Sequence, residues 1–249
     1  MCMRSFMEKN LGYLDVKILK DILAEFTPAS IKFNWRGEPL LHPEIVNLVR
    51  IAKDEGVTEV QFNTNGYFLT KDIACNLAKA GLDRIIISVD GVSKETYENI
   101  RMGGDFYKLF NNILEIYKAY ADLENAPKIR LQICKQPANE HEIKRWKETF
   151  RRLADELRVG NLFNPQGKSS YSKKQPKSCN QLWQRMTINW NGDIFPCPSD
   201  FLETEKMGNI RCISIHEAWH SPKMEYLRKS IQEYGRNHTN LCKNCSSYC

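Results

Sequence analysis

Strand patterns and helix patterns alternate through the first two thirds of the chain, and this alternation limits the possible folds more than any other feature. Apolar residues recur at helical spacing in the longer segments, and short, mainly apolar runs separate them. Repeated strand–helix units form right-handed crossovers, so they predict an α/β fold with a parallel sheet, either open or rolled into a barrel. The predicted strands are 31–35, 59–63, 84–89, 128–133 and 159–163, and the predicted helices are 14–26, 43–55, 71–80, 106–121 and 140–157.

A polar, glycine-containing turn follows each of the first three predicted strands. The turns are Gly37-Glu38-Pro39, Thr64-Asn65-Gly66 and Ser88-Val89-Asp90-Gly91. Parallel sheets place their chemistry at the carboxyl ends of the strands. The three turns together therefore predict one functional rim, although each of them alone is also what turn geometry demands.

The C-terminal part of the chain follows a different pattern. Segments 186–190 and 193–195 flank Asn191-Gly192, which is a strong hairpin signal, and helical patterns follow at 214–219 and 223–233. A stretch that contains Ser and Pro precedes the hairpin. Much of the excess of basic residues that gives the net charge of +6 lies in this stretch, at Lys168, Lys173, Lys174 and Lys177. We interpret this stretch as a solvated linker rather than a phosphate-binding patch, so no nucleic-acid partner is expected. The expected domains are 1–165 and 179–249, joined by the linker 166–178.

Six of the nine cysteines lie at or after position 179, namely at 179, 197, 212, 242, 245 and 249. The first ten residues contain no hydrophobic signal segment, and no run of about 18 apolar residues exists, so we expect a cytoplasmic protein without a membrane partner. Cytoplasmic thiols stay reduced, and clustered cysteines therefore favour metal binding over disulfides. Spacing alone does not separate zinc from an iron–sulfur cluster, because both take four thiolates.

Several motifs resemble those of a known family. Residues 31–110 resemble the barrel of radical S-adenosylmethionine (SAM) enzymes, through residues 37–43, the turns 64–66 and 88–91, and Ile100-Arg101-Met102-Gly103-Gly104. Residues 179–245 resemble the cysteine-rich extension called SPASM in its short single-cluster form, called twitch, through Gly192-x4-Cys197, residues 207–210 and Cys242-x2-Cys245. This resemblance implies a partial parallel (β/α)6 barrel that lacks its first strand, followed by a small hairpin-and-helix subdomain rich in cysteine.

The resemblance implies that the rim binds SAM. Gly37 would let the backbone approach the ligand closely, and Glu38 would accept hydrogen bonds from the ammonium group at the methionine end. Ser88 and Asp90 would bind the ribose hydroxyls, and Arg101 would pair with the SAM carboxylate. The implied cofactor-binding residues are Gly37, Glu38, Pro39, Asn65, Ser88, Asp90 and Arg101.

Four of these residues also have a purely structural interpretation. The structural alternative for Glu38 is a cap on the helix that follows it, and the alternative for Asp90 is an Asx turn. Arg101 would serve as well in a surface salt bridge. Asn65 is also a residue type that tolerates the left-handed conformation of a turn.

The resemblance further implies an auxiliary [4Fe–4S] cluster in the C-terminal subdomain. Its four ligands would be Cys179, Cys197, Cys242 and Cys245. Cys249 and Cys212 are spare candidates, and the spacing from Cys245 to Cys249 also permits chelation.

The catalytic [4Fe–4S] cluster is where the sequence departs from the family pattern. Radical SAM enzymes hold this cluster with Cys-x3-Cys-x2-Cys, and three thiolates leave one iron open to bind SAM. Here only Cys2 is available, and Cys2-Met3-Arg4 followed by a helix resembles the third cysteine and what comes after it. We therefore expect the sequence to begin inside the motif, with cysteines encoded at the second and sixth residues before Met1. The chain as given is then expected to be inactive alone.

The implied function is generation of a 5′-deoxyadenosyl radical that abstracts hydrogen from a sugar-like or peptidyl substrate, with the auxiliary cluster favouring a net oxidation. A one-electron donor such as flavodoxin or ferredoxin is the implied protein partner. No side chain is nominated as a catalytic residue. The alternative is a noncatalytic binding protein with a structural zinc in its tail.

Overall fold

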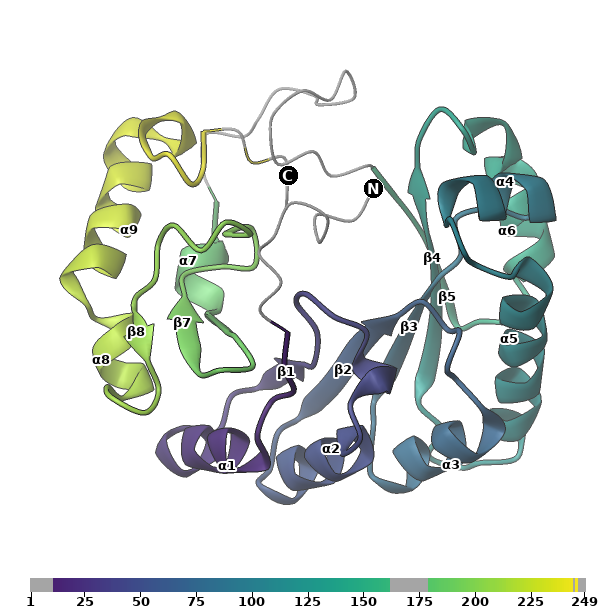
Figure 1. The fold of residues 1–249 in the computed structure, drawn as a ribbon, viewed down its shortest axis with the longest axis horizontal. Coiled ribbons are helices and arrows are strands. Elements are labelled where there is room, and N and C mark those ends of the chain that lie inside the picture. The colour runs from purple at the N-terminus through teal and green to yellow at the C-terminus, as the bar shows by residue number, and fades with distance from the viewer. Residues whose placement is uncertain (1–10, 162–178, 244, 246–249) are drawn as a thin grey trace. The chain divides into compact units, whose positions relative to one another are not determined.

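The computed structural model describes residues 11–161, 179–243 and 245 (Figure 1). The chain divides into two compact units, one formed by residues 27–161 and the other by residues 1–26 with 162–249. The predicted linker 166–178 lies outside the described residues. The domain bounds expected from the sequence stay a prediction. Among the described residues, no helix is both long and apolar enough to cross a membrane.

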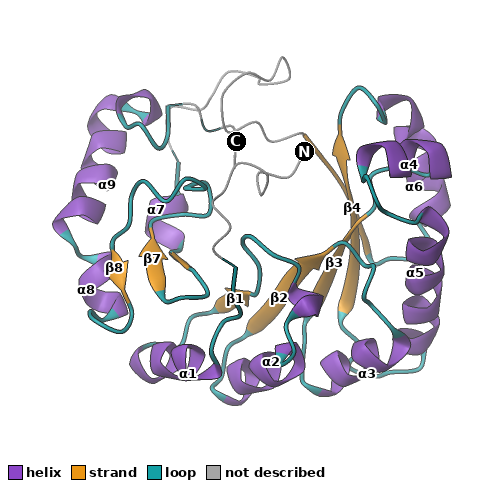
Figure 2. Ribbon diagram, in the orientation of Figure 1, coloured by secondary structure: helices purple, strands orange, loops and turns teal. Residues whose placement is uncertain are grey.

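The unit 27–161 is built on five parallel strands in the order β1-β2-β3-β4-β5 (Figure 2). Because strand order follows chain order, each crossover returns to the next position in the same sheet. This confirms the expected α/β fold with a parallel sheet. The strands are β1 (Ser30–Lys32), β2 (Glu59–Thr64), β3 (Arg84–Ser88), β4 (Lys128–Lys135) and β5 (Glu156–Asn161).

Helices cover one face of this sheet (Figure 2). Their buried residues recur at helical spacing, as Leu48, Val49 and Ala52 do in α2. They are α2 (Ile45–Asp54), α3 (Lys71–Lys79), α4 (Lys94–Ile100), α5 (Phe106–Ala121) and α6 (Ile143–Phe150), with the short 3₁₀ helices η2 (Pro39–Leu41) and η3 (Glu140–Glu142).

The other face of the sheet carries polar side chains. In β2, Val60, Phe62 and Thr64 are buried, whereas the alternating residues are only partly so. β4 repeats this alternation, with Ile129, Leu131 and Ile133 buried. Since side chains alternate between the two faces of a strand, Gln61 and Asn63 lie on the face opposite the buried residues of β2. This face suits a polar ligand better than a dry core.

The helix predicted at 140–157 is wrong in its second half. α6 ends at Phe150, and β5 begins at Glu156. Asp155 explains the early change, because its N–H donates to Ile129 O at 2.9 Å and its Oδ2 accepts from Ile129 N at 2.7 Å. These two bonds attach the chain to β4 and leave no room for another helical turn. Helix α4 was not predicted at all.

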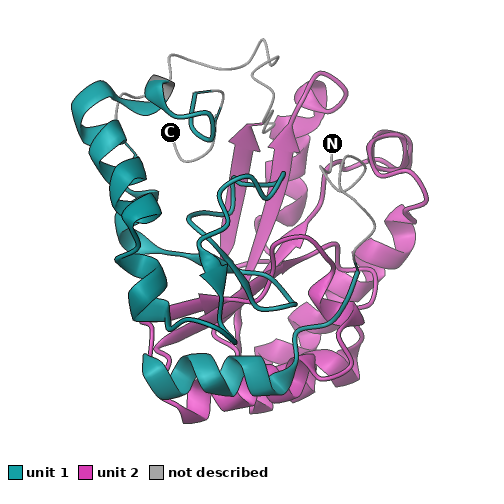
Figure 3. Cartoon of the chain, turned by 60° about the vertical axis from the view of Figure 1, so that its left-hand side comes forward, with its two compact units in different colours: residues 1–26, 162–249 teal, residues 27–161 magenta. Residues whose placement is uncertain are grey.

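The described residues of the second unit form a small antiparallel sheet with helices around it (Figure 3). The predicted hairpin is confirmed, because Thr187 pairs with Phe195 and Ile188 with Ile194 around Gly192, whose φ is 89°. A third strand, which the sequence did not reveal, completes the sheet. The elements are α1 (Val16–Glu25), α7 (Gln181–Gln184), β6 (Thr187–Ile188), β7 (Asp193–Phe195), β8 (Gly208–Asn209), α8 (Ile215–Trp219), α9 (Pro222–Tyr234) and η4 (Arg236–His238).

Helix α1 packs within this second unit. Its buried Ile18 shares an apolar cluster with Ile194 of β7, Ile210 and Ala218. Glu25 Oε2 also accepts from Ile215 N at 2.7 Å. The hairpin therefore rests on a helix that comes from the opposite end of the sequence.

Candidate functional site

Glu38 joins the loop after β1 to the loop after β2. Its Oε1 accepts from Thr64 Oγ1 at 2.6 Å, and its Oε2 accepts from Asn65 N at 2.8 Å. Oε1 also lies 3.2 Å from Leu40 N and caps η2, as the structural interpretation of Glu38 requires. Both carboxylate oxygens thus have partners in the protein.

The loop after β2 is held in a conformation that only glycine tolerates well. Gly66 has a φ of 74°, and a Cβ there would lie 2.5 Å from Leu109 Cδ1 and 2.9 Å from Ile87 Cγ2. The Asn65 side chain accepts from Tyr67 N at 2.8 Å, so it forms an Asx turn. Asn112 of α5 donates to Gly66 O at 2.9 Å, and this hydrogen bond holds the loop against α5.

Gly37 and Pro39 flank Glu38 and differ in their surroundings. Gly37 has open space where a Cβ would stand, and it lies outside the left-handed region. No packing or backbone requirement of the described protein therefore explains a glycine at this position. Pro39 is buried at the start of η2, where a missing N–H costs nothing.

Asp90 and Arg101 form a pair at the end of β3. Arg101 Nη2 lies 2.6 Å and Nε 2.7 Å from Asp90 Oδ2, while Asp90 Oδ1 accepts from Cys134 N at 2.8 Å. Asp90 is 1% exposed, whereas a quarter of the Arg101 side chain is exposed. Asp90 therefore holds Arg101 in place and ties the loop to β4.

A row of polar residues that the sequence analysis missed adjoins Ser88. The register pairs Ser88 with Gln132 of β4, and Gln132 with Arg158 of β5. Gln132 Nε2 donates to Ser88 Oγ at 3.1 Å. On β2, the Asn63 Oδ1 atom is buried and has no hydrogen-bond partner among the described residues. The alternation of polar and apolar residues along 59–64 and 128–133 was the signal that would have revealed this row.

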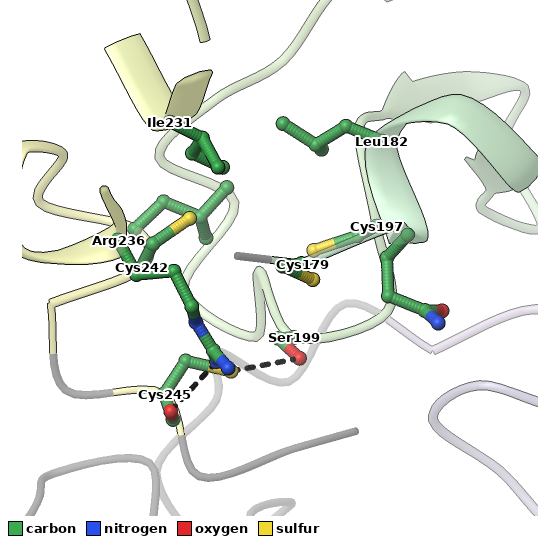
Figure 4. A pocket seen from close by; sticks show the side chains of 10 residues that line it. Cys179, Leu182, Cys197, Ser199, Ile231, Arg236, Cys242 and Cys245 are labelled. Atoms are coloured by element: carbon green, nitrogen blue, oxygen red, sulfur yellow. Dashed lines mark hydrogen bonds between the residues drawn. The ribbon is translucent and has the colours of Figure 1, made fainter. Parts of the chain in front are cut away.

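The second unit brings the four predicted cluster ligands to one pocket. Cys179, Cys197, Cys242 and Cys245 line it together, and Figure 4 shows their side chains surrounding one space. The first precedes α7, the second follows the hairpin, and the other two follow η4. The family resemblance had suggested this set, and the fold brings together cysteines that are up to 66 positions apart. The remaining lining residues are Gln181, Leu182, Ser199, Ile231, Arg236 and Leu241.

The pocket is buried enough to disfavour charged thiolates in the absence of a bound metal. Burial raises the pKa of the Cys197 thiol to about 12, and the charges of Cys242 and Cys245 act in the same direction. Burial also raises the pKa of Cys242, with further contributions from Cys245 and Cys179. Negative charge on neighbouring thiols thus opposes ionisation of Cys197 and Cys242.

The four thiols of the pocket are a donor set that either a zinc ion or a [4Fe–4S] cluster takes. Among the described residues, no three His, Cys, Asp or Glu side chains lie close enough together to hold one metal ion. Either a tetrahedral zinc ion or a [4Fe–4S] cluster would therefore require the four thiols to move when it binds. The Gln181 side chain is 9% exposed, and its Oε1 has no partner among the described residues. A buried orphan polar atom in a wall of thiols fits a pocket shaped around an inorganic group.

The other cysteines of interest lie elsewhere. Cys212 is exposed and is not among the residues that line the pocket. Cys2 and Cys249 lie outside the described residues, so their predicted roles stay predictions. Cys75 and Cys134 belong to the other unit.

Sequence models of two known families match the two parts of the chain. The model of the radical SAM superfamily matches residues 14–125, and the model of SPASM, an iron–sulfur cluster-binding domain, matches residues 179–246. The chain thus contains a radical SAM domain followed by a SPASM domain. These two domains imply SAM and [4Fe–4S] clusters, including an auxiliary cluster, as cofactors. Four thiols are the donor set that such a cluster takes.

Curated relatives resemble part of this radical SAM protein. It is 33% identical over 139 residues to a probable GTP 3′,8-cyclase of Saccharolobus islandicus, a match that covers 56% of this chain and 43% of the relative. It is 40% identical over 98 residues to a GTP 3′,8-cyclase of Limosilactobacillus fermentum, which covers 39% of this chain and 28% of the relative. The match thus spans less than half the length of these curated relatives.

Solved structures share the fold over almost the whole chain. BtrN in complex with AdoMet and 2-DOIA is 22% identical with a TM-score of 0.66, over 98% of this chain and 85% of BtrN. The anSMEcpe structure with bound AdoMet is 16% identical with a TM-score of 0.70, over 97% of this chain and 81% of that one. Streptococcus suis SuiB bound to the precursor peptide SuiA is 18% identical with a TM-score of 0.66, over 99% and 66%. At these identities the likeness establishes the fold alone.

Proposed function

We propose that the chain carries the SAM-binding rim and the auxiliary-cluster domain of a radical SAM oxidoreductase that acts on a sugar-like or peptidyl substrate. The observation that carries the proposal is the pocket shared by Cys179, Cys197, Cys242 and Cys245. When bound, the catalytic cluster and SAM supply a 5′-deoxyadenosyl radical that abstracts hydrogen, and the auxiliary cluster supplies a one-electron acceptor. An acceptor within the same chain favours loss of a second electron and a proton from the substrate, which is a net oxidation.

The residues of the rim divide into ligand contacts and supports. Gly37 leaves open space beside its backbone, which suits close approach of the methionine end of SAM. Ser88 accepts a hydrogen bond from Gln132, and its own hydroxyl hydrogen is available to a ribose. Asp90 is already engaged through both oxygens, so we assign it the role of presenting Arg101 to the SAM carboxylate.

Glu38 and Asn65 both support the rim, and we assign Glu38 a contact with the ligand as well. Glu38 is partly exposed and can accept from the SAM ammonium while it retains its bonds to the loop after β2. Asn65 sets the turn that places this loop at the rim. Pro39 fixes the start of η2 and so the direction in which Glu38 leaves the strand end.

The relatives support this reading at the level of substrate class. BtrN was solved with AdoMet and 2-DOIA, and SuiB with a precursor peptide, so the fold accommodates both small molecules and peptides in those proteins. The one-electron donor would be a small redox protein such as flavodoxin or ferredoxin. Of the first 74 residues only Cys2 offers a thiolate, so the chain as given is expected not to cleave SAM alone.

Anaerobic assay of 5′-deoxyadenosine formation tests this function. The chain extended ahead of Met1 by a strand and two further cysteines, so that Cys2 completes Cys-x3-Cys-x2-Cys, is compared with the chain as given under reducing conditions. We expect SAM cleavage only by the extended chain, and formation of an oxidised product two hydrogens lighter from an aminocyclitol or a peptide. Cleavage at equal rates by both chains would show that the two added cysteines are not needed, and would contradict the placement of Cys2 as the third ligand of Cys-x3-Cys-x2-Cys. In the extended chain, Gly37→Val should weaken SAM binding about tenfold without unfolding the rim.

A second candidate function is chemistry on a purine nucleotide. The 33% identity to a probable GTP 3′,8-cyclase exceeds the identity to any of the three solved structures described above. The same assay separates the two candidates. Stimulation of 5′-deoxyadenosine formation by GTP, with no effect of aminocyclitols or peptides, would favour the nucleotide substrate.

The remaining alternative is a noncatalytic binding protein with a structural zinc. It uses the same four thiols, which as a donor set suit a zinc ion as well as a cluster. Zinc without acid-labile sulfide in the anaerobically purified chain would favour this alternative.

A further inference from the structure

The four-cysteine pocket contains a buried guanidinium group. Arg236, the first residue of η4, is 2% exposed and lines the pocket together with the cysteines (Figure 4). Its Nη2 donates to the carbonyl oxygen of Cys245 at 2.7 Å, which fixes the group against a predicted ligand. Arginine keeps its positive charge at every pH at which a protein stays folded. The wall of the pocket therefore holds a permanent positive charge.

Further polar groups besides Arg236 lie beside the predicted ligands. Two hydroxyl groups add to the polar environment, since Ser199 Oγ lies 3.4 Å from Cys245 Sγ and Thr239 Oγ1 accepts from Cys242 N at 3.3 Å. Arg236 differs from these hydroxyls because it contributes a full charge.

A buried positive charge acts unequally on the two oxidation states of a cluster. A [4Fe–4S] core held by four thiolates is anionic, and one-electron reduction makes it more so. Net charge, hydrogen bonds and solvent exposure set the reduction potential of such clusters. In a site shielded from water the interaction with a fixed charge is only weakly screened. The reduced state therefore gains more from Arg236 than the oxidised state does.

We propose that Arg236 is the counter-charge of the auxiliary cluster, which raises the reduction potential of the cluster and makes it a better acceptor of an electron from the substrate. This role of a positioning residue rests on the proposed assignment of Cys179, Cys197, Cys242 and Cys245 as the ligands. It extends that assignment, because it explains how a cluster buried among sulfurs accepts further negative charge.

The test is the midpoint potential of the auxiliary cluster in the anaerobically reconstituted full chain, measured by redox titration with electron paramagnetic resonance. Iron and sulfide are counted first, and a chain with Cys197 and Cys242 both replaced by Ala identifies the signal. At a fixed solution potential, we expect Arg236→Gln to lower the ratio of reduced to oxidised cluster about tenfold. This change corresponds to a midpoint potential lower by about 59 mV for a one-electron couple. Arg236→Lys keeps the charge and should stay within about threefold of the parent ratio.

Arg228→Gln is the matched control. Arg228 lies in the same unit and donates to two carbonyl oxygens, those of Leu182 at 3.0 Å and Trp219 at 2.8 Å, but does not line the pocket. Its replacement should leave the ratio within about threefold of the parent value, because its charge lies outside the pocket wall.

The outcomes separate the two proposals. An unchanged potential in Arg236→Gln, or an equal shift in Arg236→Lys, would overturn the counter-charge. If Arg236→Gln fails to assemble the cluster, retention by Arg236→Lys supports the need for a charge, and loss in both variants contradicts it. A parent chain that assembles no auxiliary cluster would overturn the ligand assignment itself, and the role of Arg236 with it.

Discussion

At the scale of single residues, the buried carboxylate of Asp90 does the most to order the rim. It receives a hydrogen bond from Cys134 N on one oxygen and two from Arg101 on the other. Its own backbone oxygen accepts from Asn139 Nδ2 at 3.0 Å. A buried carboxylate is stable only when its oxygens are satisfied in this way. The loop that follows β3 is therefore organised around one side chain.

Asp90→Asn should lower the free energy of unfolding by about 2–3 kcal/mol, because the substitution leaves Arg101 without its counter-charge and places an N–H group against existing donors. Urea unfolding followed by circular dichroism measures the change. Glu115→Gln is the control in the same unit, because its pair with Lys118 is exposed and should contribute less than about 0.5 kcal/mol. Equal effects of the two substitutions would show that Asp90 is not a structural centre.

At the scale of elements, the loop between β2 and α3 sets where the rim can be. Gly66 turns the chain in the left-handed region against Leu109 and Ile87, which are both almost fully buried. Gly37 in the neighbouring loop has neither constraint. The two glycines therefore serve different purposes, one in folding and one at the proposed ligand.

Gly66→Ala should destabilise the unit 27–161 by about 2 kcal/mol or more, since it adds left-handed strain to a Cβ overlap with buried side chains. Gly37→Ala should change the free energy of unfolding by less than about 0.5 kcal/mol. Thermal and urea unfolding of both variants make the comparison. If Gly37→Ala lowered the free energy of unfolding more than Gly66→Ala, the roles assigned to the two glycines would be contradicted.

The start of α4 depends on Glu142, which reaches across from η3. Its carboxylate accepts from Val92 N at 2.8 Å and from the Ser93 hydroxyl, next to the loop that holds Asp90. Burial pushes the pKa of Glu142 upward, but the hydrogen bonds from Ser93, Val92 and Thr96 outweigh it and leave the pKa below its ordinary value. The carboxylate thus stabilises the fold in its charged form.

The pH dependence of stability follows from this lowered pKa. The contribution of Glu142 is complete above the pKa of the unfolded carboxyl, about 4.3, and is lost as the pH falls through the lower folded value. Glu142→Gln should cost about 1–3 kcal/mol at pH 7 and progressively less in acid. Urea unfolding at pH 7 and at pH 3 measures this, with the exposed Glu148→Gln on the following helix α6 as the control. A cost that does not change with pH would contradict the charged role.

At the scale of the whole molecule, the sequence predicted what local patterns encode and missed what tertiary contacts create. The strand–helix alternation, the strand-end turns and the family motifs are local patterns. They predicted the parallel sheet, the rim and the set of four cysteines. Pairs such as Asp90 with Arg101 or Arg236 with Cys245 depend on side-chain placement, which spacing does not fix. The end of α6 was mispredicted because Asp155 binds β4, a contact 26 residues away along the chain. Tertiary contacts of this kind override the helix propensity of the local sequence.

The central claim is that four cysteines from the second unit hold an auxiliary [4Fe–4S] cluster, and iron and acid-labile sulfide content tests it most directly. The anaerobically reconstituted chain is compared with one in which Cys179, Cys197, Cys242 and Cys245 are all Ala, and with a control in which Cys75, Cys134 and Cys212 are Ala. We predict about four iron and four sulfide ions in the parent and the control, and almost none in the four-cysteine variant. Iron and sulfide retained without the four cysteines, or bound zinc with no sulfide in the parent, would contradict the claim.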